Sequence, residues 1–432
     1  MKQILLQGPA NSRSGYGDHF RDIVGSLIRD GKHEIKIVNT NWGACPNNAL
    51  SDDSEMNKSI QSCIIDPSTV KAQPDLFIVC SIPTDFIPRG KKNLGITAGI
   101  EVNLCGMDFI KGVNNMDRVI VPSKFTKDVL MQTVYDQMNN QKQKVGELRT
   151  AKPIDVVFEG LDISIYNKDA TAESVNDILD KVPESFAFLA AGHWLQGDLG
   201  QDRKDMGMVV KTFCEAFKNR KNTPALILKT SGAGFSILDR NEMLTRIDKI
   251  KATIKDAKKL PEVYLLHGDL TDKEMAAMYN HPKIKAMVSF TKGEGYGRPL
   301  LEFAATGKPI LVSNWSGHLD FMNPKYTELL PGNLTQIHKS ARWDEKMFPE
   351  QARWFTVHYP TAKQVIQNVF ENYKDYLKKS RGSAHYVKTN FSMDKMDEQI
   401  VKIVDEMLAD VPSTVPFAMP APGTLPNLPN LQ

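Results

Sequence analysis

The sequence predicts an α/β fold in which two doubly wound domains face a central cleft. Three observations predict it. The chain of 432 residues is long enough for two domains, and two series of short apolar runs alternate with helix-like stretches, as in parallel α/β sheets. A seam near 165–183 separates the two series, so we assign 1–170 to an N-terminal domain and 183–390 to a C-terminal domain.

The first series opens with a strand over 3–8, a glycine-rich loop at 14–17 and a helix over about 18–30. Further strands are expected at 33–39, 75–80, 93–98, 118–121 and 154–158. This succession is typical of a doubly wound domain, in which ligands bind beyond the carboxyl ends of the strands.

The second series has strand-like runs at 186–191, 225–229, 263–267, 286–290 and 309–313. Helices are expected at 207–217, 240–258, 272–279 and 299–306. Thr271 is a suitable N-cap for the third of these helices. The segment 391–411 repeats apolar residues on one helical face, and closely spaced prolines predict a flexible tail over 412–432.

Composition indicates a soluble protein of the cytoplasm. Apolar residues make up 41% and charged residues 24% of the chain, and the net charge of +3 favours an anionic partner only weakly. No apolar run reaches the roughly 18 residues that span a bilayer, and the N-terminal apolar stretch is too short for a signal peptide. The five cysteines form no CxxC pair, which favours reduced thiols in a reducing compartment.

The segment 290–322 contains the most informative motif. Gly293, Gly295 and Gly297 follow a predicted strand and precede a predicted helix. Main-chain amides of such a loop, together with the positive end of the helix, suit a pyrophosphate. Glu294 and Glu302 flank the loop, and their carboxylates can accept hydrogen bonds from vicinal hydroxyls. If the glycine-rich loop is considered alone, the alternative to a ligand site is an ordinary strand–loop–helix turn whose acidic side chains are solvated.

This stretch resembles the donor-site motif of the family-4 retaining glycosyltransferases (glycosyl transferases group 1). The resemblance continues through VNNMDRVIVPSKFTKDVL, VVFEGLDISIYN and FAFLAAGHW…DRKDMGMVVKTFCEAFK, in the right order, and covers roughly 4–330. It implies the GT-B fold: two Rossmann-like domains, with a C-terminal helix that returns toward the N-terminal domain. The opening QGPANSRSGYGDHFRDI is similar to glycosyltransferases encoded by tailed phages.

The resemblance assigns roles to residues of the glycine-rich motif. It implies that Glu294 contacts the donor sugar and that Glu302 binds the ribose. It also implies that the backbone of Gly295, Tyr296 and Gly297 donates hydrogen bonds to the sugar or the β-phosphate.

Basic side chains are expected to hold the donor diphosphate. The resemblance assigns Lys204 to this role, but His193 stands where the family has an arginine, and Arg203 is the candidate replacement for the missing charge. We therefore name Glu294, Lys204 and Arg203 as catalytic candidates. Lys229 and His267 are further donor-side candidates at strand ends, although a lysine that merely caps its strand would look the same.

The acceptor side is expected on the N-terminal domain. Glycines in the loop after the first strand would allow a ligand to approach the backbone, and a nearby acid could bind the acceptor. The candidates are Gly15, Tyr16, Gly17, Asp18 and Glu101.

The resemblance implies a retaining, front-face transfer of a hexose or pentose without a covalent intermediate. The sequence contains no Asp-x-Asp motif and no His/Cys cluster with zinc spacing. We therefore expect no metal and no cofactor, with the nucleotide-sugar, preferably a UDP-sugar, as the co-substrate. Basic side chains and a helix N-terminus would stabilise the leaving diphosphate.

The acceptor is the least determined part of the prediction. Lysines at 89–92 and 141–152 could line a groove for DNA phosphates. A hydroxymethylated base in duplex DNA, flipped out of the helix, is therefore the leading acceptor hypothesis. Protein, lipid and small glycan acceptors are alternatives. So are a phosphorolytic or epimerising enzyme of the same fold and a non-catalytic module that binds nucleotide-sugar or DNA.

Overall fold

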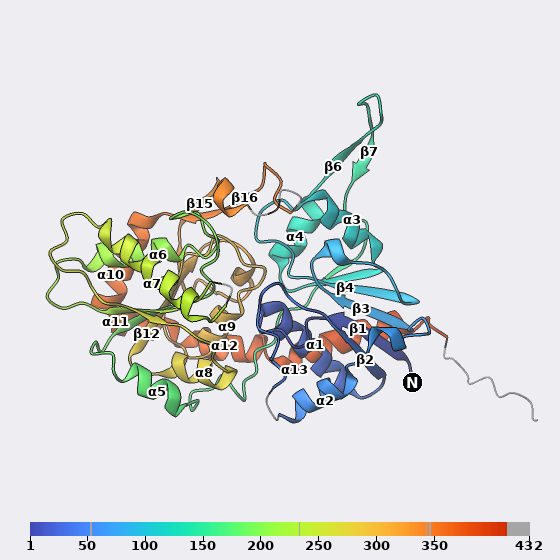
Figure 1. Ribbon diagram of the computed structural model, residues 1–432, viewed down its shortest axis with the longest axis horizontal. Coiled ribbons are helices and arrows are strands. Elements are labelled where there is room, and N and C mark those ends of the chain that lie inside the picture. The colour runs from blue at the N-terminus through green and yellow to red at the C-terminus, as the bar shows by residue number, and fades with distance from the viewer. Residues whose placement is uncertain (52–53, 233, 343, 345–346, 413–432) are drawn as a thin grey trace, which may run out of the picture.

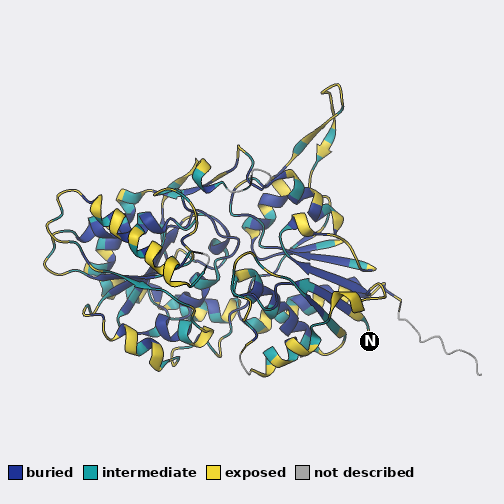
Figure 2. Cartoon of the chain, viewed as in Figure 1, coloured by how far each residue is buried: buried dark blue, intermediate teal, exposed yellow. Residues whose placement is uncertain are grey.

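A computed structural model describes residues 1–51, 54–232, 234–342, 344 and 347–412. These residues form two α/β domains that lie side by side (Figure 1). Each domain contains a six-stranded parallel sheet, and the strands of both sheets are mostly buried between helices (Figure 2). Two doubly wound domains are therefore present, as the alternation of strands and helices predicted.

The N-terminal sheet contains β1 (Gln3–Gly8), β2 (Glu34–Asn39), β3 (Leu76–Cys80), β4 (Lys92–Ile96), β5 (Arg118–Val121) and β8 (Ile154–Val156). Its strand order is β2-β1-β3-β4-β5-β8. The helices of this domain are α1 (Gly15–Asp30), α2 (Glu55–Cys63), α3 (Met107–Asn115) and α4 (Lys124–Gln132). Core clusters lie on both faces of this sheet. Its strands are apolar because helices cover both faces of the sheet.

The C-terminal sheet contains β9 (Ala187–Ala191), β10 (Ala225–Lys229), β11 (Val263–Leu266), β12 (Ile284–Ser289), β13 (Ile310–Ser313) and β14 (Glu328–Leu330). Its order is β11-β10-β9-β12-β13-β14. The first strand of this domain, β9, therefore lies between β10 and β12, whereas β1 of the N-terminal sheet lies between β2 and β3. Its helices are α5 (Glu173–Leu179), α6 (Met206–Phe217), α7 (Ile237–Ala252), α8 (Asp272–Asn280), α9 (Arg298–Ala304), α10 (Tyr359–Glu371), α11 (Tyr373–Ser380) and α12 (Gly382–Asn390).

Two antiparallel hairpins lie outside the sheets. The first, β6 (Tyr135–Met138) with β7 (Lys144–Leu148), projects from the N-terminal domain (Figure 1). The second, β15 (Gly332–Gln336) with β16 (Arg353–Val357), extends from the C-terminal domain, and its Trp354 packs in the core of the N-terminal domain. Short 3₁₀ helices occupy Pro67–Thr69, Pro83–Asp85, Gly317–Asp320 and Lys339–Ala341.

Local capping moves two predicted helix boundaries. Ser14 accepts a hydrogen bond from the amide of Gly17 and is the N-cap of α1. Residues 15–17, predicted as a loop, therefore form the first turn of this helix. Ser236 likewise caps α7 by accepting from the amide of Asp239, so that this helix begins at Ile237, before the predicted start at 240. It ends at Ala252, before the predicted end at 258.

The last helix, α13 (Met393–Leu408), returns to the N-terminal domain, as predicted, and packs there beside α1 (Figure 1). Met396 is fully buried in the N-terminal core. Asp397 accepts hydrogen bonds from Arg29 Nε (2.7 Å) and Ser26 Oγ (2.6 Å) on α1. The predicted flexible tail at 412–432 lies outside the described residues, apart from Pro412.

We expect α13 to be a stabilising part of the N-terminal core. Met396→Ala removes a buried side chain and leaves a cavity, so it should lower the free energy of unfolding by about 2–5 kcal/mol. Chemical denaturation measures this loss, with the exposed Lys395→Ala on the same helix as the control. Equal stabilities of the two variants would show that the helix is not packed as described.

Candidate active site

Two loops at the carboxyl ends of the C-terminal sheet are joined by a buried ion pair. Lys292 follows β12, and Asp205 precedes α6. Lys292 Nζ lies 3.2 Å from Asp205 Oδ2, and the two side chains are 1% and 0% exposed. Tyr359 donates a second hydrogen bond to Asp205 (2.7 Å), and the amide of Lys292 donates to the carbonyl of Arg203 (2.8 Å). The loop of Arg203 is thereby fixed beside the glycine-rich loop.

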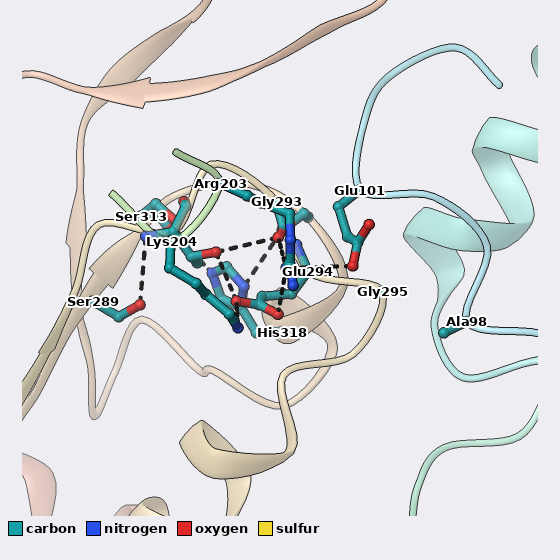
Figure 3. Close-up of polar contacts among 12 residues, drawn as sticks. Ala98, Glu101, Arg203, Lys204, Ser289, Gly293, Glu294, Gly295, Ser313 and His318 are labelled. Carbon is teal, nitrogen blue, oxygen red and sulfur yellow. Dashed lines mark hydrogen bonds and ion pairs between the residues drawn. The ribbon is translucent and has the colours of Figure 1, made fainter. Parts of the chain in front are cut away.

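The three catalytic candidates meet at this junction (Figure 3). Lys204 Nζ donates to Glu294 Oε1 (2.6 Å), and Arg203 Nη1 lies 3.3 Å from Glu294 Oε2. Thr291 also donates to the carboxylate (2.6 Å). Burial by itself would raise the pKa of Glu294, but Lys204 and Arg203 outweigh it and lower the pKa to about 2. Glu294 is therefore an anion held between two cations.

The N-terminal domain closes directly over the glycine-rich loop. A Cβ atom at Gly293 would lie 2.3 Å from the carbonyl oxygen of Glu101, and one at Gly295 would lie 2.5 Å from that of Ala98. Both distances are shorter than van der Waals contact, so these glycines are needed for the two domains to meet. Ser123 Oγ donates to the carbonyl of Gly295 (2.6 Å) across the same interface.

Glu101 reaches the cations from the opposite domain. Its Oε1 atom lies 3.3 Å from Arg203 Nη1, whose other partners are Glu294 and the carbonyl of Gly293. Figure 3 shows Glu101 on the N-terminal side of this group. An acceptor-side candidate and the catalytic candidates thus share one charged cluster at the domain interface.

The main-chain amides of Gly295, Tyr296 and Gly297 are the predicted hydrogen-bond donors to the sugar or the β-phosphate. Within the described part of the chain, no hydrogen bond is made by the amides of Gly295, Tyr296 or Gly297. The side chain of Tyr296 is buried in the core against Phe321 and is therefore not available to a ligand. Three adjacent amides are thus free to bind an anion.

Glu302 lies on α9 in a second group of charges. Its Oε1 atom accepts from Arg298 Nε (3.1 Å) and its Oε2 atom from Tyr279 (3.3 Å). Burial raises the pKa of Glu302 to about 8, against the opposing effect of Arg298. The two glutamates of the motif therefore have opposite electrostatic environments.

The remaining donor-side candidates form one polar group beyond β9, β10 and β11. His193 Nδ1 lies 3.1 Å from the carbonyl of Gly232, and burial lowers the pKa of His193. Asp239 connects the amide of Gly232 (3.0 Å) to His267 Nε2 (2.6 Å). Lys229 donates to the carbonyl of Gly268 (2.6 Å) instead of extending freely into the cleft.

The acceptor-side candidates on α1 have identifiable structural partners. Tyr16 contacts Thr97 (3.0 Å) and accepts from the amide of Ala98 (3.0 Å), the residue that lies against Gly295. Asp18 pairs with Arg21 on the same helix. Gly15 and Gly17 belong to the first helical turn rather than to a loop.

Sequence reasoning missed several residues of this site. Lys292 and Asp205 were passed over because a buried ion pair leaves no periodic pattern. Arg298 lies inside the motif, between the two glutamates, and its position there was the one available signal. Asp22, which pairs with Arg298 from α1, gave none.

No group of three or more His, Cys, Asp or Glu side chains among the described residues is placed to hold a metal ion. No helix in the described ranges combines the length and the apolar character needed to cross a membrane.

Two facing doubly wound domains with a returning C-terminal helix define the GT-B fold. A glycosyltransferase from Rickettsia africae has this fold and matches with a TM-score of 0.61 at 16% identity, over 95% of this chain and 99% of its own. Sucrose-phosphate synthase from Thermosynechococcus elongatus matches with a TM-score of 0.60 at 12% identity, over 95% and 100%. HepE from Anabaena, in complex with UDP-glucose, matches with a TM-score of 0.56 at 13% identity, over 94% and 100%.

At these identities the similarity establishes the fold. The sequence matches no protein-family model and no curated protein sequence. The family-4 assignment and the phage origin therefore stay predictions.

We expect the stability of the protein to fall in acid because of Glu294. Its folded-state pKa of about 2 is below the ordinary 4.5, so it stabilises the fold above pH 4.5 and loses that contribution as the pH falls toward 2. The loss is on the order of 3 kcal/mol. Denaturation between about pH 6 and about pH 3 should give a steeper decline for the wild type than for Glu294→Gln. Parallel curves would contradict this.

Breaking the buried pair should be costly. Lys292→Met leaves Asp205 buried and unpaired, with an expected loss of about 3–5 kcal/mol in the free energy of unfolding. The exposed Lys273→Met is the control. Adding Asp205→Asn to Lys292→Met should cost less than the sum of the two single changes; additive losses would show that the two charges do not interact.

Proposed function

We propose that this protein is a glycosyltransferase that takes a sugar from a nucleotide-sugar donor. One observation carries the proposal: Glu294 is held between Lys204 and Arg203 beside three free amides, where the two domains meet. A carboxylate, two cations and an anion-binding backbone are the groups needed to hold a sugar and its diphosphate. The GT-B fold brings them together at a domain interface.

The cations are expected to change partners when the donor binds. In the described structure, both neutralise Glu294. A bound diphosphate would attract Lys204 and Arg203, and Glu294 would then be free to accept a hydrogen bond from a sugar hydroxyl. Charge on the diphosphate increases as the glycosidic bond breaks, so the cations stabilise the transition state more than the ground state.

The proposed reaction retains the anomeric configuration. The bond between the anomeric carbon and the diphosphate oxygen breaks, and a bond to the acceptor oxygen forms on the same face of the sugar. The proton of the acceptor hydroxyl passes to the departing diphosphate oxygen. No protein nucleophile and no metal takes part, and the residues of the site position the reactants.

UDP is the favoured nucleotide. HepE, which shares the fold, binds UDP-glucose. A further protein of the fold, from E. coli, is bound with UDP-2-fluoro glucose and matches with a TM-score of 0.55 at 7% identity, over 94% of this chain and 99% of its own. These relatives support UDP-sugars as the first donors to test.

The leading acceptor hypothesis remains a hydroxymethylated base in duplex DNA. Its basis is the phage-like opening and the two basic stretches of the sequence. In the structure, Lys91 pairs with Asp75 (2.7 Å), and Lys144 pairs with Asp136 (2.6 Å) and Glu147 (2.8 Å). These pairs reduce the charge available to DNA phosphates, so protein and small glycan acceptors belong in the same test.

The donor reaction is tested with a panel of UDP- and GDP-sugars. Release of nucleoside diphosphate should require one sugar nucleotide, and Glu294→Gln should lower kcat by at least about 100-fold. Nucleotide affinity, measured by calorimetry, confirms that the variant remains folded. No binding of any nucleotide by the wild type would overturn the proposal.

Acceptor and stereochemistry are tested in the same assay. Hydroxymethylated and unmodified duplex DNA, a peptide mixture and simple glycans are compared as acceptors, and NMR of the product reports its anomeric configuration. Release that is equal with and without every acceptor would indicate hydrolysis instead of transfer, and inversion would exclude the front-face mechanism.

The proposed reaction needs no metal ion, and a chelator tests this. Because Lys204, Arg203 and main-chain amides neutralise the diphosphate, a chelator should leave the rate of nucleoside diphosphate release unchanged. A loss of activity that is restored by a divalent cation would show that a metal is needed.

A further inference from the structure

Arg298 connects the two domains through two carboxylates. It is the first residue of α9, immediately after the glycine-rich loop. Its Nε atom donates to Glu302 on the same helix (3.1 Å), and its Nη1 atom donates to Asp22 on α1 of the N-terminal domain. Figure 1 shows α1 and α9 on the facing sides of the two domains.

The guanidinium lies in a largely buried and acidic environment. The side chains of Arg298, Asp22 and Glu302 are 15%, 17% and 8% exposed. Asp18 and Glu159 also face Arg298. Arg298 is therefore shared by several carboxylates, of which Asp18 also pairs with Arg21. An ion pair that is largely removed from water is strong only with good geometry.

Arginine is suited to this position because its planar guanidinium holds donors in a fixed fork. One side of the fork is occupied by Asp22 and the other by Glu302, so the orientation of Glu302 depends on where α1 lies. If the domains moved apart, Asp22 would leave, and the guanidinium would no longer be held in place. Glu302 would then lose its charged partner and keep only its tyrosine contacts, with Tyr279 and Tyr166.

We propose that Arg298 is a positioning residue that couples closure of the domains to the orientation of Glu302 toward the nucleotide ribose. The inference rests on the proposed function, because it assumes that Glu302 binds the ribose hydroxyls. By linkage, a nucleotide that engages Glu302 stabilises the contact with Asp22, and that contact in turn strengthens nucleotide binding.

The test measures the affinities of UDP and 2′-deoxy-UDP by calorimetry, because their ratio reports the contact with the ribose hydroxyl. The wild type should prefer UDP. Asp22→Asn keeps the shape of the side chain and leaves the pair of Arg298 and Glu302 in place, yet it should reduce this preference by roughly tenfold, the equivalent of one charge-assisted hydrogen bond.

A double-mutant cycle separates coupling from a general loss of stability. In the Arg298→Leu background, Asp22→Asn should have no further effect on the UDP preference. Arg298→Lys keeps the positive charge but not the planar guanidinium, so it should also lose the preference for UDP over 2′-deoxy-UDP. This variant serves as the test if Arg298→Leu does not fold. Asp269→Asn is the matched control, since it breaks another ion pair between the domains, with Arg13 (2.8 Å), that does not reach Glu302.

The outcomes distinguish this inference from the proposed function. UDP binding with an unchanged preference in Asp22→Asn would overturn only the coupling. An equal reduction by Asp269→Asn would also overturn it, because any loosening of the interface would then suffice. If the wild type binds neither nucleotide, the proposed function fails, and the coupling fails with it.

Discussion

The site depends on the buried ion pair between Lys292 and Asp205. Both side chains are almost fully removed from water, so each charge requires the other. The pair fixes two loops that are far apart in the sequence: Arg203 and Lys204 directly precede Asp205, and Glu294 follows Lys292 by two residues. The catalytic candidates are thereby brought within hydrogen-bonding distance by a contact that is itself buried.

The site also depends on the close contact between the two domains. Gly293 and Gly295 allow the backbones at Glu101 and Ala98 to approach the loop, and charged contacts then cross the interface at Arg203 and Arg298. The two motif glutamates use these contacts differently. Glu294 is kept ionised by two cations, whereas the pKa of Glu302 is raised by burial.

Much of the fold was predictable because parallel strands that are buried on both faces appear as continuous apolar runs. The sequence was least informative where local preference and tertiary context disagree. Residues 15–17 carry two glycines, which disfavour helix, yet the cap at Ser14 and packing of α1 make them helical. The basic stretch at 141–152 forms part of a hairpin whose lysine pairs with nearby acids, a result that charge composition does not predict.

The sequence by itself determined the alternation of strands and helices, the glycine-rich turn and the spacing of Glu294 and Glu302, because these follow from local periodicity and short-range steric rules. Only the tertiary structure decided which charged side chains pair with one another. Glu101 meets Arg203, Asp22 meets Arg298, and Lys292 meets Asp205 across long separations in the chain. Ion pairs of this kind depend on three-dimensional proximity and on exclusion of water, and neither quantity is written in the order of the residues.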